Sequence, residues 1–108
     1  MDKVAEIRLV YVTTGTIQNA KEIAKILVSE RLAACCSIIQ NVISVFSWQN
    51  NIEERNEYML IIKTIEKKLN QLEERVLQLS LDEVPEILSN PIDYAHKEYY
   101  DWLISSLD

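Results

Sequence analysis

The chain has 108 residues, of which 48% are hydrophobic and 26% are charged, and its net charge is −6. This composition is typical of a folded protein, and we expect residues 1–108 to form a single domain with its own core. Nucleic acid and anionic membranes are not expected as partners, because no basic cluster offsets the acidic balance. No signal peptide or membrane-spanning run is predicted, which favours a cytoplasmic location. The single glycine excludes glycine-rich phosphate loops, and the single histidine excludes multi-histidine metal centres.

The first predicted elements are a strand and a helix. β-branched and aromatic residues dominate the segment EIRLVYVTT at residues 6–14, which predicts a strand that is largely buried on both faces. Gly15 follows as a turn residue, and Thr16 is predicted to cap the next helix. In that helix, apolar residues recur at the spacing of an amphipathic helix: Ala20, Ile23, Ala24, Leu27 and Val28.

Two long β-prone segments come next and predict a hairpin. They cover residues 34–48 and the stretch that ends at Thr64, and the polar Gln49-Asn50-Asn51 between them predicts the turn. Apolar residues occupy both faces of this hairpin, whereas two helices cover only one face of a sheet. The uncovered face predicts a closed homo-oligomer joined through the hairpin edges. The alternative is that the terminal helix covers this face.

The remaining pattern completes a known arrangement of elements. A second amphipathic helix is predicted with Thr64 as its N-cap and with apolar residues at helical spacing: Ile65, Leu69, Leu72, Val76 and Leu79. Pro85 precedes a short predicted strand over residues 86–89, and a last helix is predicted over residues 95–106. This order predicts an α+β fold of the ferredoxin-like βαββαβ type, an antiparallel sheet with two helices on one face and a C-terminal helix.

Five separated segments then resemble a known family: ERLAACC at 30–36, SVFSWQNNIEE at 44–54, LIIKT at 60–64, DEVPEIL at 82–88 and YYDWL at 99–103. In order and spacing they resemble the CutA divalent-cation tolerance family. The resemblance implies a homotrimer, an association with tolerance to copper and other divalent cations, and an architecture similar to that of the PII signalling proteins. The chain departs from the family at Ser80, where many members have a histidine that is a proposed copper ligand. It also departs at Val12, where some bacterial members have a cysteine.

The candidate metal ligands are Cys35, Asp82, Glu83 and Glu86, and three of them are predicted to bind the ion: Glu86, Cys35 and Glu83. Copper prefers thiolate and imidazole, whereas carboxylates suit harder ions such as magnesium or manganese, so the expected cofactor is copper or another divalent cation. For Cys35 the favoured interpretation is nevertheless a buried structural thiol. A buried and unpaired Glu86 would be costly, and an ion pair with Lys63 or Arg31 is favoured over a metal or ligand in a cleft between subunits.

The other candidates concern assembly and anion binding. Four aromatic residues are predicted to anchor subunit interfaces: Trp48, Phe46, Trp102 and Tyr99. Lys63 is expected either to pair with a carboxylate or to contact an anion in the intersubunit cleft. No nucleophile and base stand at a spacing that indicates an active site, so the chain is predicted not to be an enzyme. The leading hypothesis is a homotrimer for divalent-cation tolerance, and the alternative is a PII-like signalling or scaffold trimer that binds a small anion or a partner protein.

Overall fold

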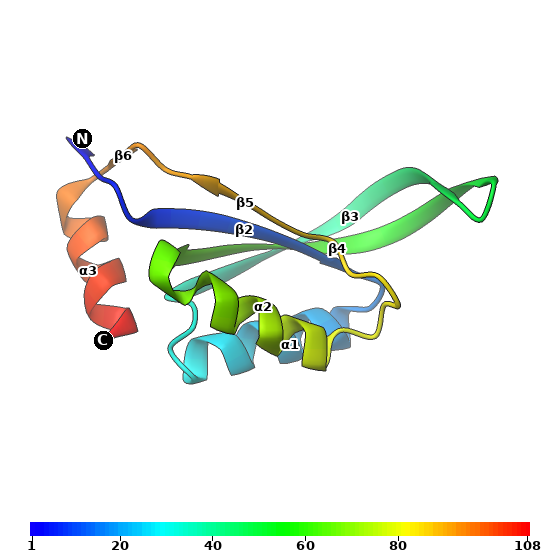
Figure 1. Cartoon of the computed structure of the whole chain (residues 1–108), viewed down its shortest axis with the longest axis horizontal. Helices are drawn as coiled ribbons and strands as arrows, with labels where there is room; N and C mark the ends of the chain where they lie inside the picture. Colours follow the sequence, from blue (N-terminus) through cyan, green and yellow to red (C-terminus); the bar gives the residue numbers. More distant parts are fainter.

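The computed structural model describes residues 1–108. Its elements, in chain order, are β1 (Asp2–Lys3), β2 (Ile7–Thr14), α1 (Ile17–Ser29), β3 (Cys35–Trp48), β4 (Asn51–Ile65), the 3₁₀ turn η1 (Glu66–Lys68), α2 (Leu69–Leu79), β5 (Ile87–Pro91), β6 (Tyr94–Ala95) and α3 (Lys97–Leu107). The molecule measures 45 by 25 by 23 Å, and the hairpin of β3 and β4 reaches well beyond the other elements (Figure 1). None of the helices combines the length and the apolar character needed to cross a membrane.

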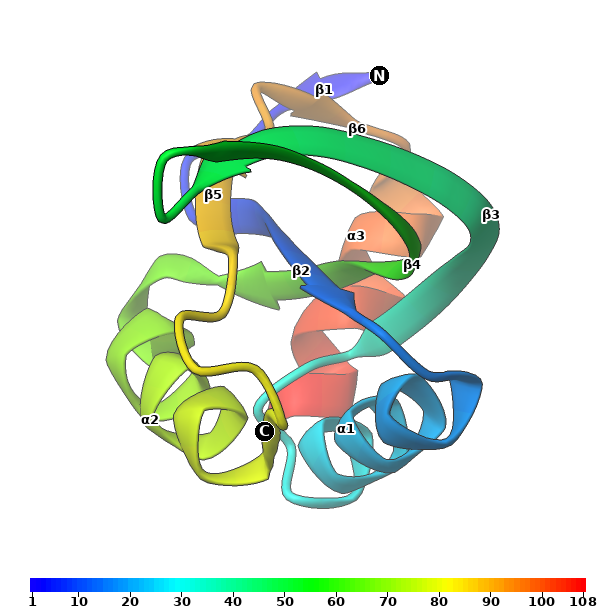
Figure 2. The same ribbon diagram turned by 90° about the vertical axis from the view of Figure 1, so that its right-hand side faces the viewer.

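Four strands form one antiparallel sheet in the order β3-β4-β2-β5. Helices α1 and α2 lie side by side on one face of this sheet, and α3 lies at the end where the chain begins (Figures 1 and 2). The predicted α+β, ferredoxin-like arrangement is therefore confirmed. β1 and β6 form a separate two-stranded pair that the sequence did not predict.

The main core lies between the sheet and the helices α1 and α2. Alternate residues of β2 point to the helices, and the register places Ile62 beside Val10 and Leu60 beside Val12. These four side chains are almost completely buried and pack against the helices, whose core residues are Ala20, Ile23, Ala24, Leu27, Leu72 and Val76. Burying each large apolar side chain stabilises the fold by about 1.5–3 kcal/mol.

The opposite face of the sheet is covered only at one end. There α3 packs Leu103 and Leu107 against Ile7 and Ile65, in a second apolar cluster. The rest of this face, which we call the open face, carries half-buried or exposed apolar side chains: Leu9, Tyr11, Ile39, Met59, Ile61 and Leu88. The terminal helix therefore does not cover the open face as a whole.

Beyond the body of the sheet, β3 and β4 continue as a two-stranded arm. β2 ends opposite Tyr58, so that residues 42–57 pair only with each other. The predicted turn is confirmed at Gln49 and Asn50, whose φ angles of 50° and 68° suit a two-residue hairpin turn. A β-bulge lies between Ile39 and Val42. Both long edges of the arm are without a partner strand in this chain.

The two predicted helix caps had different outcomes. Thr16 caps α1, because its Oγ1 accepts a hydrogen bond of 3.1 Å from the backbone N–H of Asn19. The prediction that Thr64 caps the second helix is wrong. β4 continues to Ile65, and the buried Thr64 hydroxyl instead donates to the carbonyl oxygen of Leu32 at 2.7 Å.

Candidate functional site

A groove of about 600 Å³ lies between the hairpin arm and the loop that joins α2 to β5. Its lining combines six carboxylates, one guanidinium and two aromatic rings with smaller side chains: Thr13, Phe46, Trp48, Glu53, Glu54, Arg55, Glu57, Asp82, Glu83, Val84 and Glu86. Glu53, Arg55 and Glu57 alternate along β4, which places them on one face of the arm. The groove is therefore strongly acidic.

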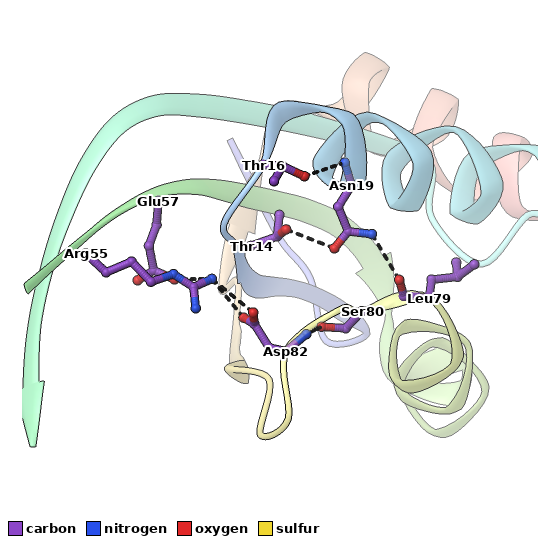
Figure 3. A network of polar contacts seen from close by, with 8 residues as sticks. All are labelled: Thr14, Thr16, Asn19, Arg55, Glu57, Leu79, Ser80 and Asp82. Carbon is purple, nitrogen blue, oxygen red and sulfur yellow. Dashed lines mark hydrogen bonds and ion pairs between the residues drawn. The ribbon is translucent and has the colours of Figure 1, made fainter. Parts of the chain in front are cut away.

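Arg55 connects the arm to the loop across the floor of this groove. Its Nη2 atom lies 3.0 Å from both carboxylate oxygens of Asp82 and 3.3 Å from Oε2 of Glu57 (Figure 3). The Glu57 side chain is only 8% exposed, and a carboxylate this deeply buried needs a cationic partner. Arg55 supplies that partner and ties the loop to β4.

A chain of hydrogen bonds holds the loop in place behind Arg55. The Thr14 hydroxyl donates to Oδ1 of Asn19, and Nδ2 of Asn19 donates to the carbonyl oxygen of Leu79, both at 2.9 Å (Figure 3). The hydroxyl of Ser80 then accepts the backbone N–H of Asp82 at 3.2 Å. Ser80, which stands where the resemblance places a histidine, therefore shapes the turn that orients Asp82.

The three predicted metal ligands do not meet within one chain. Glu83 and Glu86 line the groove. Cys35 lies on the open face, where Nζ of Lys63 is 3.7 Å from its Sγ and 2.6 Å from Oγ of Ser37. No group of three or more His, Cys, Asp or Glu side chains in the structure is arranged to hold a metal ion. Metal binding by these residues stays a prediction.

The ion pair predicted for Glu86 is absent from the chain. None of the ion pairs in the structure involves Glu86, Lys63 or Arg31. The Arg31 guanidinium donates instead to the backbone carbonyl of Asp108. Lys63 has no carboxylate partner, and its contact with an anion stays a prediction. Val12 is a fully buried core residue and does not line the groove.

The four aromatic residues predicted at interfaces are all on the surface of the single chain. Phe46 and Trp48 line the groove, and Tyr99 and Trp102 lie on α3 with their ring centroids 5.5 Å apart. Each is between 38% and 46% exposed. Their role as interface anchors stays a prediction.

Sequence reasoning did not identify several residues of the site, and Arg55 and Glu57, which form the ion pair of the groove, are the most important of them. The signal was present in the alternation of charged residues at positions 53, 55 and 57 of a predicted strand, which places all three on one face. The sequence gives no distance to Asp82, which is 27 positions further along the chain. For that reason the ion pair is visible only in the structure.

The pKa of the Cys36 thiol is raised by its surroundings, and this shift makes the stability of the chain depend on pH. Burial, and then the neighbouring Cys35, raise the pKa of the Cys36 thiol from 9.0 to about 12, although Lys63 acts in the opposite direction. Between these two pH values the folded chain keeps a proton that the unfolded chain has lost. The free energy of unfolding should therefore fall by up to about 1.4 kcal/mol per pH unit as the pH rises through this window.

We expect Cys36→Ala to remove this contribution, so that its stability declines less steeply than that of the unmodified chain above pH 9. Urea unfolding at pH 8, 9 and 10 measures the difference between the two slopes. Ser37→Ala, a change at the next residue with no titrating group, is the control and should keep the original slope. Parallel pH profiles for the unmodified chain and Cys36→Ala would contradict the prediction.

Together these features define a ferredoxin-like α+β domain with a projecting hairpin arm and an acidic groove at the base of that arm. Residues 8–106 match the family described as CutA1 divalent ion tolerance protein, and the chain belongs to this family. The resemblance found in the sequence is thereby confirmed.

Individual relatives agree in sequence and in structure. The divalent-cation tolerance protein CutA of Thermus thermophilus is 41% identical over 95 residues, which cover 88% of this chain and 92% of the relative. The solved structure of CutA from Synechococcus elongatus superposes with a TM-score of 0.95 at 31% identity, covering 99% of this chain and 95% of that one. The chloroplastic CutA of Arabidopsis thaliana is 36% identical, and the match covers 91% of this chain but only 54% of the plant protein.

Proposed function

We propose that this chain acts in tolerance to divalent cations as a homotrimer whose acidic groove attracts hydrated divalent cations. The observation that carries the proposal is a groove with six carboxylates and one guanidinium in a member of a divalent ion tolerance family. The name of the Thermus relative refers to the same function. Clustered carboxylates raise the local concentration of cations before any specific contact is made.

The donor chemistry of the groove indicates which ions it suits. Its lining offers carboxylate oxygens but neither thiolate nor imidazole, since Cys35 and His96 lie elsewhere. Oxygen ligands favour hard cations such as magnesium and manganese, whereas copper prefers sulfur and nitrogen. The residues therefore fit a loosely held, hydrated cation near Glu83 and Glu86 and do not fit a preformed copper centre.

The surface of the arm supports the homotrimer. The arm carries three large apolar side chains that are 62–78% exposed, namely Ile43, Val45 and Ile52. Exposed apolar patches of this kind usually mark a protein–protein interface. The arm also has two unpaired strand edges, which natural proteins normally cover. A closed ring of copies that packs the arms on the open faces buries both features at once.

The groove proposal is tested with manganese. We expect Mn²⁺ to raise the midpoint of thermal unfolding of the unmodified chain, because an ion that binds only the folded state stabilises it by about 2.7 kcal/mol at one hundred times its Kd. The double variant Glu83→Gln/Glu86→Gln should lose most of this shift. Differential scanning calorimetry with and without Mn²⁺ measures it, and native mass spectrometry counts the ions per trimer.

A matched double variant distinguishes Mn²⁺ binding in the groove from an effect of the overall charge of the chain. Glu73→Gln/Glu74→Gln removes the same two charges from the exposed side of α2, and it should retain the Mn²⁺ shift. An equal loss in both double variants would contradict a site in the groove. Copper uptake that is lost in Cys35→Ala and kept in Glu83→Gln/Glu86→Gln would instead assign metal binding to Cys35.

A further inference from the structure

A thiol and an amine lie side by side on the open face, at the end of the β3–β4 hairpin opposite to the arm. Cys35 and Lys63 are partners across the two strands, and Nζ of Lys63 lies 3.7 Å from Sγ of Cys35. The same Nζ atom donates a hydrogen bond of 2.6 Å to Oγ of Ser37, which holds the lysine side chain along β3. Lys63 forms no ion pair with a carboxylate, so its amine stays beside the thiol.

This pair of nucleophiles is only partly covered. Cys35 and Lys63 are half-buried, and Ser37 beside them is exposed. Tyr99 of α3 borders the thiol, since burial, and then the charge and hydrogen bond of Cys35, raise the pKa of the Tyr99 hydroxyl. A hydroxyl in this position can donate a hydrogen bond to an oxygen that develops negative charge. Tyr99 is itself 44% exposed, so a small reagent can reach Sγ beside it.

We propose that Cys35 and Lys63 form an acyl-transfer pair, in which Cys35 takes an acyl group from a small thioester and passes it to Lys63. This inference goes beyond the proposed function and does not depend on it, because neither residue lines the acidic groove. The substrate class is an acyl thioester, and the product is an amide on Nζ of Lys63. The modification removes the positive charge of Lys63 and returns Cys35 to its free thiol.

The transfer takes two steps, and neither of them oxidises or reduces a group. In the first step the Cys35 thiolate attacks the carbonyl carbon of the donor thioester. A bond to Sγ forms, the bond to the donor sulfur breaks, and the donor leaves as a thiol with the proton that Cys35 has released. In the second step Nζ of Lys63 attacks the same carbon as the neutral amine. A C–N bond forms, the C–Sγ bond breaks, and Sγ takes up the proton that Nζ loses.

Proximity favours Lys63 over the other lysines of the chain. Reacting atoms that are held about 3–3.5 Å apart react far faster than the same groups in free solution. An acyl carbon bonded to Sγ comes within this range of Nζ, because the two atoms are 3.7 Å apart. Lys21 and Lys25 on α1 are exposed, but no hydrogen bond joins either of them to a thiol. Exposure alone therefore favours these two lysines, whereas transfer from a thiol favours Lys63.

Incubation of the intact protein with acetyl-coenzyme A at mildly alkaline pH tests the pair, and peptide mass spectrometry measures the acetylation of each lysine. We expect Lys63 to be acetylated about tenfold faster than Lys21 or Lys25. Cys35→Ala should remove this excess. Lys63→Arg keeps the positive charge but offers no amine, so it should leave on Cys35 an acetyl thioester that hydroxylamine removes.

Cys36→Ala is the matched control, because it removes the neighbouring thiol, which lies on the opposite face of β3, and it should leave the acetylation of Lys63 unchanged. An excess at Lys63 that persists in Cys35→Ala would show direct acylation and overturn the inference. An acetyl group that stays on Cys35 of the unmodified chain without reaching Lys63 would overturn it as well. So would a rate at Lys63 no higher than at Lys21 and Lys25, a comparison that needs no variant.

Discussion

The double variant Ile43→Asp/Val45→Asp is expected to be a folded monomer, whereas the unmodified chain is expected to be a trimer. Both side chains are exposed on the two-stranded arm, at 62% and 64%, so aspartate at these positions leaves the core of the single chain intact. In an assembly that buries the arm, the two carboxylates per chain would be desolvated without a partner. Each such group costs several kcal/mol, which is enough to dissociate a trimer at micromolar concentration.

Sedimentation equilibrium at micromolar concentration measures the change, and circular dichroism verifies that the variant is folded. Leu77→Asp is the matched control, because Leu77 is a similarly exposed apolar residue, at 52%, but lies on α2 away from the arm and the open face. This control should remain trimeric. A monomeric unmodified chain would contradict the proposed trimer, and a double variant that stays trimeric would contradict the role of the arm.

Asn19→Ala is expected to lower the free energy of unfolding by about 3 kcal/mol, which is a large change for the loss of one buried side-chain amide. Asn19 is 4% exposed, and its side chain satisfies both the Thr14 hydroxyl and the carbonyl oxygen of Leu79. Alanine leaves the buried Thr14 hydroxyl and the carbonyl oxygen of Leu79 without this partner, and each unsatisfied group costs about 1–3 kcal/mol. The same change loosens the connection between β2, α1 and the end of α2.

Urea unfolding at one fixed chain concentration measures this loss, because the stability of an oligomer depends on concentration. Asn70→Ala is the control, since it is the same substitution at an exposed position of α2 and should change stability by less than about 0.5 kcal/mol. A loss of similar size in both variants would show that the buried amide has no special role.

Local patterns were sufficient to predict most of the fold. The helical spacing in α1 and the β-branched content of β2 reflect burial within a single element, and the structure confirms both. For Thr64, the local pattern led to a wrong prediction. A threonine before a helical pattern is a good N-cap in isolation, but here the register of β4 takes it into the core, where its hydroxyl meets Leu32. Tertiary packing determines whether Thr64 caps the helix or lies in the core, and this packing cannot be derived from local patterns in a single sequence.

The groove was only partly predictable for a related reason. Glu83 and Glu86 were found because they lie within a short recognisable segment, DEVPEIL. Arg55 acquires its role through the ion pair with Asp82, which lies on the loop between α2 and β5, and Glu57 acquires its role through its ion pair with Arg55. Cys35 was grouped with the glutamates by chemistry alone, and the fold places it on the open face instead.

The bulge in β3 determines which side chains of the arm belong to the groove. Before it, Cys35, Ser37 and Ile39 share the open side of the sheet, and after it the even-numbered residues do, because Val42 stands opposite Glu57. One extra residue has therefore exchanged the two faces on which the β3 residues beyond it lie, while the residues of β4 keep their regular alternation. Loss of Asn41, which has a φ of 62° within this bulge, would send Phe46 and Trp48 to the face of the arm opposite to Glu53, Arg55 and Glu57. At this place a change in the length of β3 therefore changes which face of the arm carries its aromatic side chains.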